Sequence, residues 1–375
     1  MIFRELHTVI ESKLFQNKAI ILLGARQTGK TTMLKELTKN KEGVLWLNAD
    51  EADTVALFEN ASSTRFKAIF AGKKIIVIDE AQRISNIGLK LKLITDQISD
   101  VQIIVTGSSA FDLANSVNEP LTGRKWEYKL FPLSFAEMVN HHGFIEENRM
   151  LKHRLIYGYY PEVVKNQGDE KNILKQLSDS YLYKDILMWE RIKKPDKLLK
   201  LLQSLALQIG SEVSFNNIGN LIGLDNQTVE KYIQLLEQTY IIFRLPAFSR
   251  NHRKELKAGK KIYFYDTGIR NALIANFNLP ELRPDIGSLW ENFIISERIK
   301  FLQYKNIWTN SYFWRTQDQQ EIDYIEEMDG VLFAYEIKWN ANKKSFLSKS
   351  FADTYPNNEY KVINPENFEK FLIQD

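Results

Sequence analysis

The segment Gly24-Ala25-Arg26-Gln27-Thr28-Gly29-Lys30-Thr31 has residue types and a spacing that suit the binding of phosphate groups. Glycines let successive backbone N–H groups curl around an anion, and Lys30 adds a positive charge near the β- and γ-phosphates. The Thr31 hydroxyl is of a type that ligates Mg²⁺, and a helix beginning near Lys30 directs its positive end at the same place. A chance match in a glycine turn is the alternative. Because an apolar run ends at Leu23 just before the segment, we favour a nucleotide-binding loop that includes Thr32.

A pair of acids follows the apolar run Ile75–Ile78. Asp79 is expected at the carboxyl end of a buried strand, where a carboxylate can hold Mg²⁺ through water. Glu80 comes one residue later and is the candidate that orients and polarises the attacking water. A strand that runs into an acidic turn would look the same. At this distance after a phosphate-binding loop, the pair instead predicts nucleoside triphosphate hydrolysis.

Three further residues are candidates for the same reaction. The run Val101–Val105 is followed by Thr106 and Ser108, whose hydroxyls would report whether a γ-phosphate is present. Such residues are also common in turns. Arg124 precedes an expected strand over Glu127–Phe131 and is a candidate for stabilising transition-state charge, either in its own chain or from a neighbouring subunit of a homo-oligomer. A solvated arginine is the competing interpretation.

Near the C-terminus, Asp329-Gly330 is a strong signal for a two-residue hairpin turn. The resulting register places Asp323 opposite Glu336 and Glu321 opposite Lys338, all on one face because strand side chains alternate. Two directly opposed carboxylates repel each other unless a cation lies between them, which suggests a divalent metal with Lys338 beside it. A solvent-facing polar ladder is the alternative. The other face would receive an apolar set: Ile322, Tyr324, Tyr335, Ile337 and Trp339.

The middle of the chain favours a winged helix-turn-helix. A short helix over Phe215–Gly223 and a second helix capped by Asp225 are followed by a wing strand over Ile241–Leu245. One face of the second helix is apolar and the other carries residue types that suit base edges. The apolar stripe is Val229, Tyr232, Ile233 and Leu236, and the polar face is Asn226, Gln227, Lys231 and Gln234.

Charge supports a DNA-binding role for this region. Between Arg191 and Ile262 there are thirteen Lys or Arg and six Asp or Glu, a net charge of +7, so the rest of the chain carries −4. A winged helix used only as a protein–protein adaptor is the alternative. The basic run suited to neutralising phosphates is Arg250, Arg253, Lys254, Lys257, Lys260 and Lys261.

The elements that must position these residues form an α/β pattern. Apolar runs at 19–23, 44–47, 75–78 and 101–105 alternate with helical stretches, as expected for strands buried on both faces of a parallel sheet. We expect an ATPase-type parallel-sheet domain over 1–135, a helical linker or lid over 136–195, a winged helix over 196–262 and a further α/β domain over 263–375.

Composition excludes several classes of protein. The 375 residues carry a net charge of only +3 and include no cysteine, so disulfide scaffolds, thiolate zinc sites and cysteine nucleophiles are excluded. No signal peptide is recognisable, and no apolar run approaches the ~20 residues that span a bilayer. We therefore expect a cytoplasmic protein that is not in a membrane.

The chain resembles the AAA-type ATP-binding proteins of bacteria and archaea that carry a C-terminal domain of unknown function related to restriction-endonuclease-like (PD-(D/E)XK) folds. The motifs that carry the resemblance are GARQTGKTT, IIVIDEAQRI, IIVTGSSA, LTGRKWEYKLFPLSFAE, YGYYPEVV, YLYKDI, YDTGIRNAL, GSLWENFI and EIDYI…YEIKW. Ala25 departs from the proline that the family usually has. The resemblance implies ATP and Mg²⁺ as cofactors and a D…E-x-K metal site of Asp323, Glu336 and Lys338, with Glu291 as a further acid.

Two functions fit these features. The first is an ATPase that acts on or is recruited to DNA and carries a nuclease-like C-terminal domain, with Lys30, Thr31, Asp79 and Glu80 responsible for hydrolysis. The second is an ATP-dependent switch whose winged helix and silent nuclease-like fold scaffold protein partners. Both predict ATP binding, and they differ in metal-dependent cleavage and in stimulation of turnover by DNA.

Overall fold

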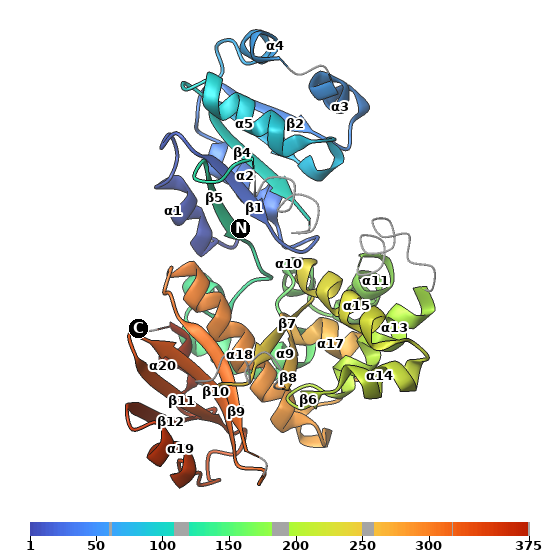
Figure 1. Ribbon diagram of the computed structural model, residues 1–375, viewed down its shortest axis with the longest axis vertical. Coiled ribbons are helices and arrows are strands. Elements are labelled where there is room, and N and C mark those ends of the chain that lie inside the picture. Colours follow the sequence, from blue (N-terminus) through green and yellow to red (C-terminus); the bar gives the residue numbers. More distant parts are fainter. Residues whose placement is uncertain (60–61, 109–119, 182–194, 250–258, 317, 374–375) are drawn as a thin grey trace. The chain divides into compact units, whose positions relative to one another are not determined.

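The computed structural model describes residues 1–59, 62–108, 120–181, 195–249, 259–316 and 318–373. The chain divides into unit 1, Met1–Pro132 with Gln238–Tyr240, and unit 2, Leu133–Glu237 with Ile241–Asp375. Their elements are labelled in Figure 1. Among the described residues, none of the helices combines the length and the apolar composition that crossing a bilayer requires.

Unit 1 is built on a parallel five-stranded sheet in the order β2-β3-β4-β1-β5. The inner strands β1, β3 and β4 are continuous apolar runs and are buried, as predicted from the sequence. The prediction of burial on both faces is wrong for Val44–Leu47, because β2 is an edge strand and its first three residues are only half-buried. The strands are β1 (Ala19–Leu23), β2 (Val44–Asn48), β3 (Ile75–Asp79), β4 (Gln102–Gly107) and β5 (Lys125–Lys129).

Helices connect these strands. The helix after β1 begins directly at the glycine loop, since Gly29 takes a left-handed φ of 93° at its N-cap. Helix α1 packs beside α2, and α4 packs beside α5. The helical elements of unit 1 are α1 (Glu5–Glu11), α2 (Lys30–Thr38), α3 (Ala52–Glu59), α4 (Ser63–Ile69), the 3₁₀ turn η1 (Ala81–Arg83) and α5 (Ile87–Gln97).

The strand order positions the predicted nucleotide site. Strand β4 lies between β1 and β3, so its carboxyl end falls between the glycine loop and the acidic pair. In open parallel sheets, ligands bind at the carboxyl ends of the strands. The loop, Thr106 and Asp79 therefore share one edge of the sheet.

Unit 2 begins with a group of short helices. Ser134 starts the first of them through a reciprocal capping box with Glu137, in which each side chain accepts from the other residue's backbone N–H. The elements are α7 (Phe135–His142), α8 (Phe144–Arg149), α9 (Leu151–Tyr157), α10 (Pro161–Lys165), α11 (Glu170–Gln176) and the turn η2 (Leu177–Tyr181).

The next segment of unit 2 runs helix–strand–helix–helix–strand–strand and closes a three-stranded sheet in the order β6-β8-β7. Gly223 ends α14 in a left-handed conformation, and Asp225 caps α15 by accepting from the Thr228 N–H at 2.9 Å, as predicted. The predicted apolar stripe of α15 is buried. The elements are α13 (Pro195–Leu207), β6 (Glu212–Val213), α14 (Phe215–Ile222), α15 (Asn226–Gln238), β7 (Ile242–Pro246) and β8 (Lys260–Phe264), followed by α17 (Thr267–Leu273) and η3 (Pro280–Leu282).

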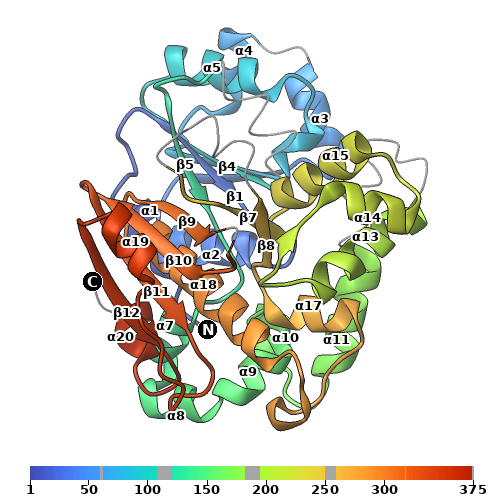
Figure 2. The ribbon, with the colours of Figure 1, turned by 60° about the horizontal axis from the view of Figure 1, so that its bottom comes forward.

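The C-terminal part of unit 2 is a long helix with a four-stranded sheet in the order β12-β11-β10-β9 (Figures 1 and 2). Phe371 of α20 packs on Tyr324 and Tyr335 on one face, whereas Phe351 of α19 packs on Trp314 on the other. The elements are α18 (Ile286–Tyr304), β9 (Asn310–Arg315), β10 (Glu321–Met328), β11 (Val331–Ile337), α19 (Lys349–Thr354), β12 (Asn358–Ile363) and α20 (Phe368–Ile373).

The hairpin of β10 and β11 has the predicted register, with pairs running from Met328↔Val331 to Tyr324↔Tyr335. Beyond that pair, β10 has an irregularity against β9 between Ile322 and Ile325. An extra residue in a strand turns the following side chains to the other face. Ile322 therefore packs in the core beside Ile325, and its predicted place on the face of Tyr324 is wrong.

Candidate nucleotide site and acidic cluster

The glycine loop after β1 has the backbone shape that its sequence predicts. A Cβ on Gly24 would lie 2.2 Å from the Leu130 carbonyl oxygen, so only glycine fits where the loop passes β5. The buried Lys30 Nζ donates to the carbonyl oxygens of Gly24 and Ala25 at 2.8 and 2.9 Å. Its ammonium group is thus held against the loop, at the point where a phosphate would lie.

Arg4 fixes the far side of this loop, a role that the sequence did not reveal. Its Nη1 donates to the Thr28 carbonyl oxygen at 2.6 Å, and its Nη2 donates to the Phe131 carbonyl oxygen at 2.7 Å. Thr28 is itself buried, and its hydroxyl donates to the Ala25 carbonyl oxygen at 2.9 Å. The remaining predicted loop residues are less enclosed: Arg26, Gln27 and Thr31 are half-buried, and Thr32 is exposed.

Asp79 joins the loop to the neighbouring strand. The Thr31 hydroxyl donates to Asp79 Oδ2 at 2.8 Å, and the Thr106 hydroxyl donates to Asp79 Oδ1. The Thr106 oxygen also accepts from the Glu80 N–H at 3.1 Å. The structure thus brings together the loop hydroxyl, both acids and Thr106. A hydroxyl and a carboxylate in contact are a donor set that fits Mg²⁺.

Gln82 positions the second acid, and it is a residue that the sequence interpretation missed. Glu80 has a left-handed φ of 53°, which turns the chain away from β3 into η1. The Gln82 Nε2 donates to Glu80 Oε2 at 2.6 Å and to the Ser108 hydroxyl at 3.1 Å. Glu80 and the buried Ser108 are therefore linked through one amide.

Arg124 does not lie at this site. It immediately precedes β5, whose first residue pairs with Ala19 at the start of β1, and its Nε contacts Asp96 Oδ1 at 2.5 Å. The loop follows the other end of β1, about 13 Å away at the usual rise per strand residue. The expected contact with a nucleotide is thus wrong for the same chain, and only the role in a neighbouring copy stays a prediction.

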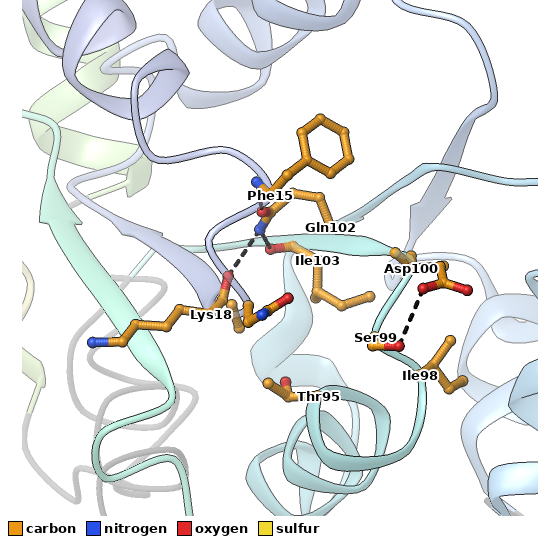
Figure 3. Close-up of a pocket in the computed structure, with 11 residues that line it drawn as sticks. Phe15, Lys18, Thr95, Ile98, Ser99, Asp100, Gln102 and Ile103 are labelled. Carbon is orange, nitrogen blue, oxygen red and sulfur yellow. Dashed lines mark hydrogen bonds between the residues drawn. The ribbon is translucent and has the colours of Figure 1, made fainter.

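A small pocket of about 110 Å³ lies in unit 1 near Ala19, at the amino edge of β1 and β4 (Figure 3). Gln102 organises it, because its Oε1 accepts from the Phe15 N–H at 2.6 Å and its Nε2 donates to the Lys18 carbonyl oxygen at 3.0 Å. These bonds fix the connection between α1 and β1. The pocket is at the opposite edge of the sheet from the glycine loop.

In unit 2, three of the four predicted C-terminal site residues converge. The Lys338 Nζ lies 3.5 Å from Asp323 Oδ2 and 2.6 Å from Glu336 Oε1. Asp323 Oδ2 also accepts from the Ile337 N–H at 2.7 Å, so this carboxylate takes up a backbone donor of β11.

Lys261 brings the fourth residue, Glu291, into a different ion pair from the one expected. The Lys261 Nζ lies 3.1 Å from Glu291 Oε1 and also contacts Glu321. Glu321 further faces Arg315 at 3.8 Å, so its predicted pairing with Lys338 is wrong. We use "acidic cluster" for the four carboxylates Glu291, Glu321, Asp323 and Glu336.

The fit of this cluster to a metal ion is limited by its lysines. In the described part of the chain, no three His, Asp or Glu side chains gather in a way that could hold a metal ion. Lys261 and Lys338 contact all four carboxylates instead. The expected Mg²⁺ site of Glu291, Asp323 and Glu336 is therefore not formed in this arrangement.

Burial dominates the proton equilibria of the cluster. Burial raises the pKa of Glu291 to about 7; nearby Asp323 raises it as well, while Lys261 lowers it. Burial and then Asp323 also raise the pKa of Glu336. Glu291 thus holds a proton near neutral pH that an exposed carboxylate would have lost.

We expect the Glu291→Gln variant to show a weaker pH dependence of unfolding than the parent. The folded-state pKa of Glu291 is about 7 against an ordinary value of 4.5, so between these values the folded state binds a proton that the unfolded state has released. The free energy of unfolding therefore falls as pH rises through this window, by up to about 3 kcal/mol.

Urea unfolding of unit 2 at pH 5 and pH 7.5, followed by tryptophan fluorescence, measures this difference. Glu359→Gln, at an exposed position of β12, is the control and should keep the parental pH dependence. Parallel pH profiles for the parent and Glu291→Gln would contradict the assignment.

The predicted DNA-contacting residues are only partly described. Asn226, Gln227, Lys231 and Gln234 are exposed on α15, as expected. Arg250, Arg253, Lys254 and Lys257 lie outside the described residues. Lys260 is half-buried, and Lys261 is 1% exposed and points into the acidic cluster. Its predicted contact with phosphates is therefore wrong, because its charge is already paired inside unit 2.

Three family models match successive parts of the chain. Residues 16–139 match an AAA domain, residues 148–280 a domain of unknown function (DUF8612), and residues 286–373 a domain of unknown function (DUF4143). The first and last matches confirm the predicted AAA-type domain and the C-terminal domain of unknown function.

Two uncharacterized relatives and one solved structure are similar to most of the chain. An uncharacterized protein of Methanocaldococcus jannaschii is 25% identical over 98% of this chain and 87% of its own. An uncharacterized protein of Haemophilus influenzae is also 25% identical, over 87% of this chain and 85% of its own. The Walker-type ATPase of Pyrococcus abyssi superposes with a TM-score of 0.52 at 15% identity, covering 73% of this chain and 96% of its own. The parallel sheet of unit 1 thus has the P-loop fold of a Walker-type ATPase, and it lies in the part of the chain that matches the AAA domain.

Proposed function

We propose that the protein binds ATP with Mg²⁺ at the glycine loop of unit 1 and hydrolyses it. The observation that carries the proposal is the pair of hydrogen bonds that Asp79 accepts from Thr31 and Thr106. The Asp79 carboxylate thereby links the phosphate loop to β4, the strand that lies between the loop and the two acids. The AAA domain and the P-loop ATPase fold support it.

Each residue has a separate role in this proposal. The loop N–H groups and Lys30 bind the phosphates, and Thr31 and Asp79 are placed to hold Mg²⁺. Bound Mg²⁺ would neutralise charge that develops on the β- and γ-phosphate oxygens. Glu80 accepts the proton of the attacking water, and Gln82 orients its carboxylate.

Hydrolysis in this scheme needs a second copy of the chain. The Arg124 guanidinium is 42% exposed and remote from its own loop. From a neighbouring copy it would stabilise the charge of the transition state. We therefore propose a homo-oligomer as the hydrolytic form.

The Lys30→Met variant should lose at least about tenfold in ATP affinity, because it removes the ammonium group that faces the phosphates. Isothermal titration calorimetry of ATP with Mg²⁺ measures the change. Lys35→Met, at an exposed position of the same helix, should leave affinity unchanged. Equal affinity of the parent and Lys30→Met, or no uptake by the folded parent, would refute the proposal.

We further propose that the segment from α13 to β8 is a winged helix that recruits the protein to DNA. Its order of elements supports this, since α14 and α15 are joined by a tight turn at Gly223 and followed by two antiparallel strands. The exposed face of α15 carries amide side chains and Lys231. The segment from α13 to β8 has ten Lys or Arg and six Asp or Glu, and this net charge of +4 favours a polyanion as the partner.

The affinity for duplex DNA should fall by at least about tenfold between 50 and 200 mM salt. Lysines that neutralise DNA phosphates displace the counterions condensed on the DNA, and added salt opposes this release. Lys231→Gln should lower affinity and reduce the salt slope, whereas Lys175→Gln on α11 should change neither. Fluorescence anisotropy of a labelled duplex measures both. A parent protein that does not bind at low salt would remove DNA from the function.

The C-terminal domain supports two roles. Asp323, Glu336 and Lys338 lie together beside α18, and the resemblance to restriction-endonuclease-like folds makes cleavage of nucleic acid the first of these roles. Lys261 and Lys338, which pair with the acids, favour the second role, a silent fold within an ATP-dependent switch that scaffolds protein partners. Divalent metal uptake distinguishes the two.

A further inference from the structure

The loop between β11 and α19 places an aromatic ring in solvent. Phe346 is 83% exposed, although phenylalanine is among the residue types that are most often buried. The residues on either side of it face inward, since Leu347 packs against the core beside the C-terminal sheet and Ser345 donates to the Glu336 carboxylate. The ring is therefore exposed because the chain around it is held. We use "Phe346 loop" for residues 339–349.

Hydrogen bonds hold the Phe346 loop at both ends. Near its start, the Asn340 carbonyl oxygen accepts from the Lys343 N–H at 3.0 Å. Near its end, the Ser348 oxygen accepts from the Phe351 N–H at 3.4 Å, and the Ser348 hydroxyl donates to the Gln320 side chain. The ring is thus presented on a loop of defined shape, and a partner can bind it without a large cost of ordering the chain.

The Phe346 loop is a basic patch on an acidic domain. It contains three exposed lysines and no acid, whereas the rest of residues 286–373 carries seven Lys or Arg and thirteen Asp or Glu. The loop thus contributes +3 where the remainder has −6. Within the part of the chain that the structure describes, the ammonium groups of these lysines form no ion pair, and they are Lys343, Lys344 and Lys349. This charge favours an anionic partner.

An exposed ring between lysines suits a strand of nucleic acid whose bases are not paired. Stacking on an aromatic ring accepts any base, because every base has a π face, and nearby lysines neutralise the phosphates of the same strand. In a duplex, the neighbouring base pairs cover the faces of each base. Only an unpaired strand can therefore place a base on a ring that protrudes from a loop.

An anionic membrane surface is the other partner of matching charge. A segment that lies in a membrane surface buries a broad apolar face. In the Phe346 loop, Leu347 is packed against the core, so the ring of Phe346 alone is available to enter lipid. One ring is a small apolar face for a membrane, but it is sufficient to stack one base.

We propose that the Phe346 loop binds single-stranded DNA: a base stacks on the Phe346 ring, and Lys343, Lys344 and Lys349 neutralise the neighbouring phosphates. The inference deepens the proposed recruitment to DNA and rests on it for the choice of DNA as the nucleic acid. It gives the C-terminal domain a contact with an unpaired strand, in addition to the duplex contact proposed for α15. This contact needs no metal ion.

The test is the fluorescence anisotropy of a labelled oligo(dT) with the 375-residue chain, without nucleotide and with EDTA, at about 50 mM salt. Phe346→Ala should lower the affinity by at least about fivefold, because it removes the stacking of one base. Phe346→Leu should lose as much, since leucine is apolar but has no π face, whereas Phe346→Trp should bind at least as tightly as the parent. Trp308→Ala removes a 96% exposed ring near Glu327 and should change nothing.

The lysines are tested through the salt dependence of the same binding. A triple variant with Gln in place of Lys343, Lys344 and Lys349 should show a slope of log affinity against log salt that is smaller by about 2, because each neutralised phosphate of a single strand contributes about 0.7. Lys361→Gln, at an exposed position of β12, should keep the parental slope. All of these side chains are exposed, so the variants should fold, which circular dichroism checks.

Several results would overturn the proposal. They are equal binding of oligo(dT) by the parent and Phe346→Ala, parental affinity of Phe346→Leu, and an unchanged salt slope of the triple variant. Tighter binding of oligo(rU) than of oligo(dT) would overturn the choice of DNA. Sedimentation with phosphatidylserine vesicles that depends on Phe346, without binding of oligo(dT), would make a membrane the partner.

Failure of the proposed recruitment through α15 gives a different pattern. Duplex binding would then be absent or insensitive to Lys231→Gln, while binding of oligo(dT) still depends on Phe346. The reverse pattern, a duplex bound through Lys231 and an oligo(dT) affinity that Phe346→Ala leaves unchanged, removes the Phe346 loop alone.

Discussion

The Glu80→Gln variant is expected to lose about 10²–10³-fold in kcat for ATP hydrolysis while it still binds ATP. Glutamine keeps the size of the side chain but cannot accept the proton of the attacking water. The Glu80 N–H donates to the Thr106 oxygen through the backbone, so this contact survives the substitution. Affinity for ATP, which depends on the loop and Lys30, should remain within a few-fold of the parent.

Phosphate release, measured under multiple and single turnover, gives the change in kcat. Calorimetry of ATP binding gives the change in affinity, so the two effects are separated. Glu36→Gln, at an exposed position of α2, is the matched control and should hydrolyse ATP at the parental rate. Gln82→Ala should lower kcat with little change in KM, since the Gln82 amide orients Glu80 and also holds Ser108. Parental turnover by Glu80→Gln would exclude Glu80 as the base.

The Gly24→Ala variant should destabilise unit 1 by on the order of 3 kcal/mol and abolish tight ATP binding. Its Cβ would meet the Leu130 carbonyl oxygen at 2.2 Å, and that oxygen belongs to the backbone and cannot rotate away. The nearby Leu130 N–H donates to the Leu23 carbonyl oxygen at 2.7 Å. Moving Leu130 aside therefore breaks a bond between β1 and its neighbour and displaces the loop.

Gly72→Ala is the control for backbone strain alone. Gly72 has a φ of 71°, and a Cβ there would have open space within 4 Å. Its cost should be about 1–2 kcal/mol, with ATP affinity unchanged. Urea unfolding and calorimetry of both variants test the distinction, and a Gly24→Ala protein with parental ATP affinity would show that the loop tolerates the added carbon.

Local patterns were sufficient to predict the nucleotide site. Four apolar runs, a glycine loop and an acidic pair each depend on neighbours in the sequence, and the strand order then brings the ends of β1, β3 and β4 to one edge. Arg4 and Gln82 were missed for different reasons. Arg4 acts on residues 24 and 127 positions away, and Gln82 is an ordinary residue of a short turn.

The acidic cluster shows where periodicity fails. The turn at Asp329-Gly330 determined the register from Met328 to Tyr324, because alternation propagates residue by residue from a hairpin turn. The irregularity between Ile322 and Ile325 ended that propagation, and it moved Ile322 to the other face. Lys261 was assigned to the basic run that would neutralise phosphates, because its acidic partners lie thirty and sixty positions away. Lys261 lies two residues before Tyr263 and therefore on the same face of β8. This spacing was the available signal that Lys261 faces inward.

Arg4 ties two parts of unit 1 that have different tasks. Its guanidinium group holds the backbone of the phosphate loop at Thr28 and the backbone of Phe131, next to the last residue of unit 1 before the chain enters unit 2. The guanidinium group is planar and rigid, so it cannot follow a shift of the Thr28 carbonyl without straining its hydrogen bond to the Phe131 carbonyl. In the proposed ATPase cycle, a backbone shift of the loop would therefore strain the hydrogen bond at Phe131, where the chain leaves unit 1.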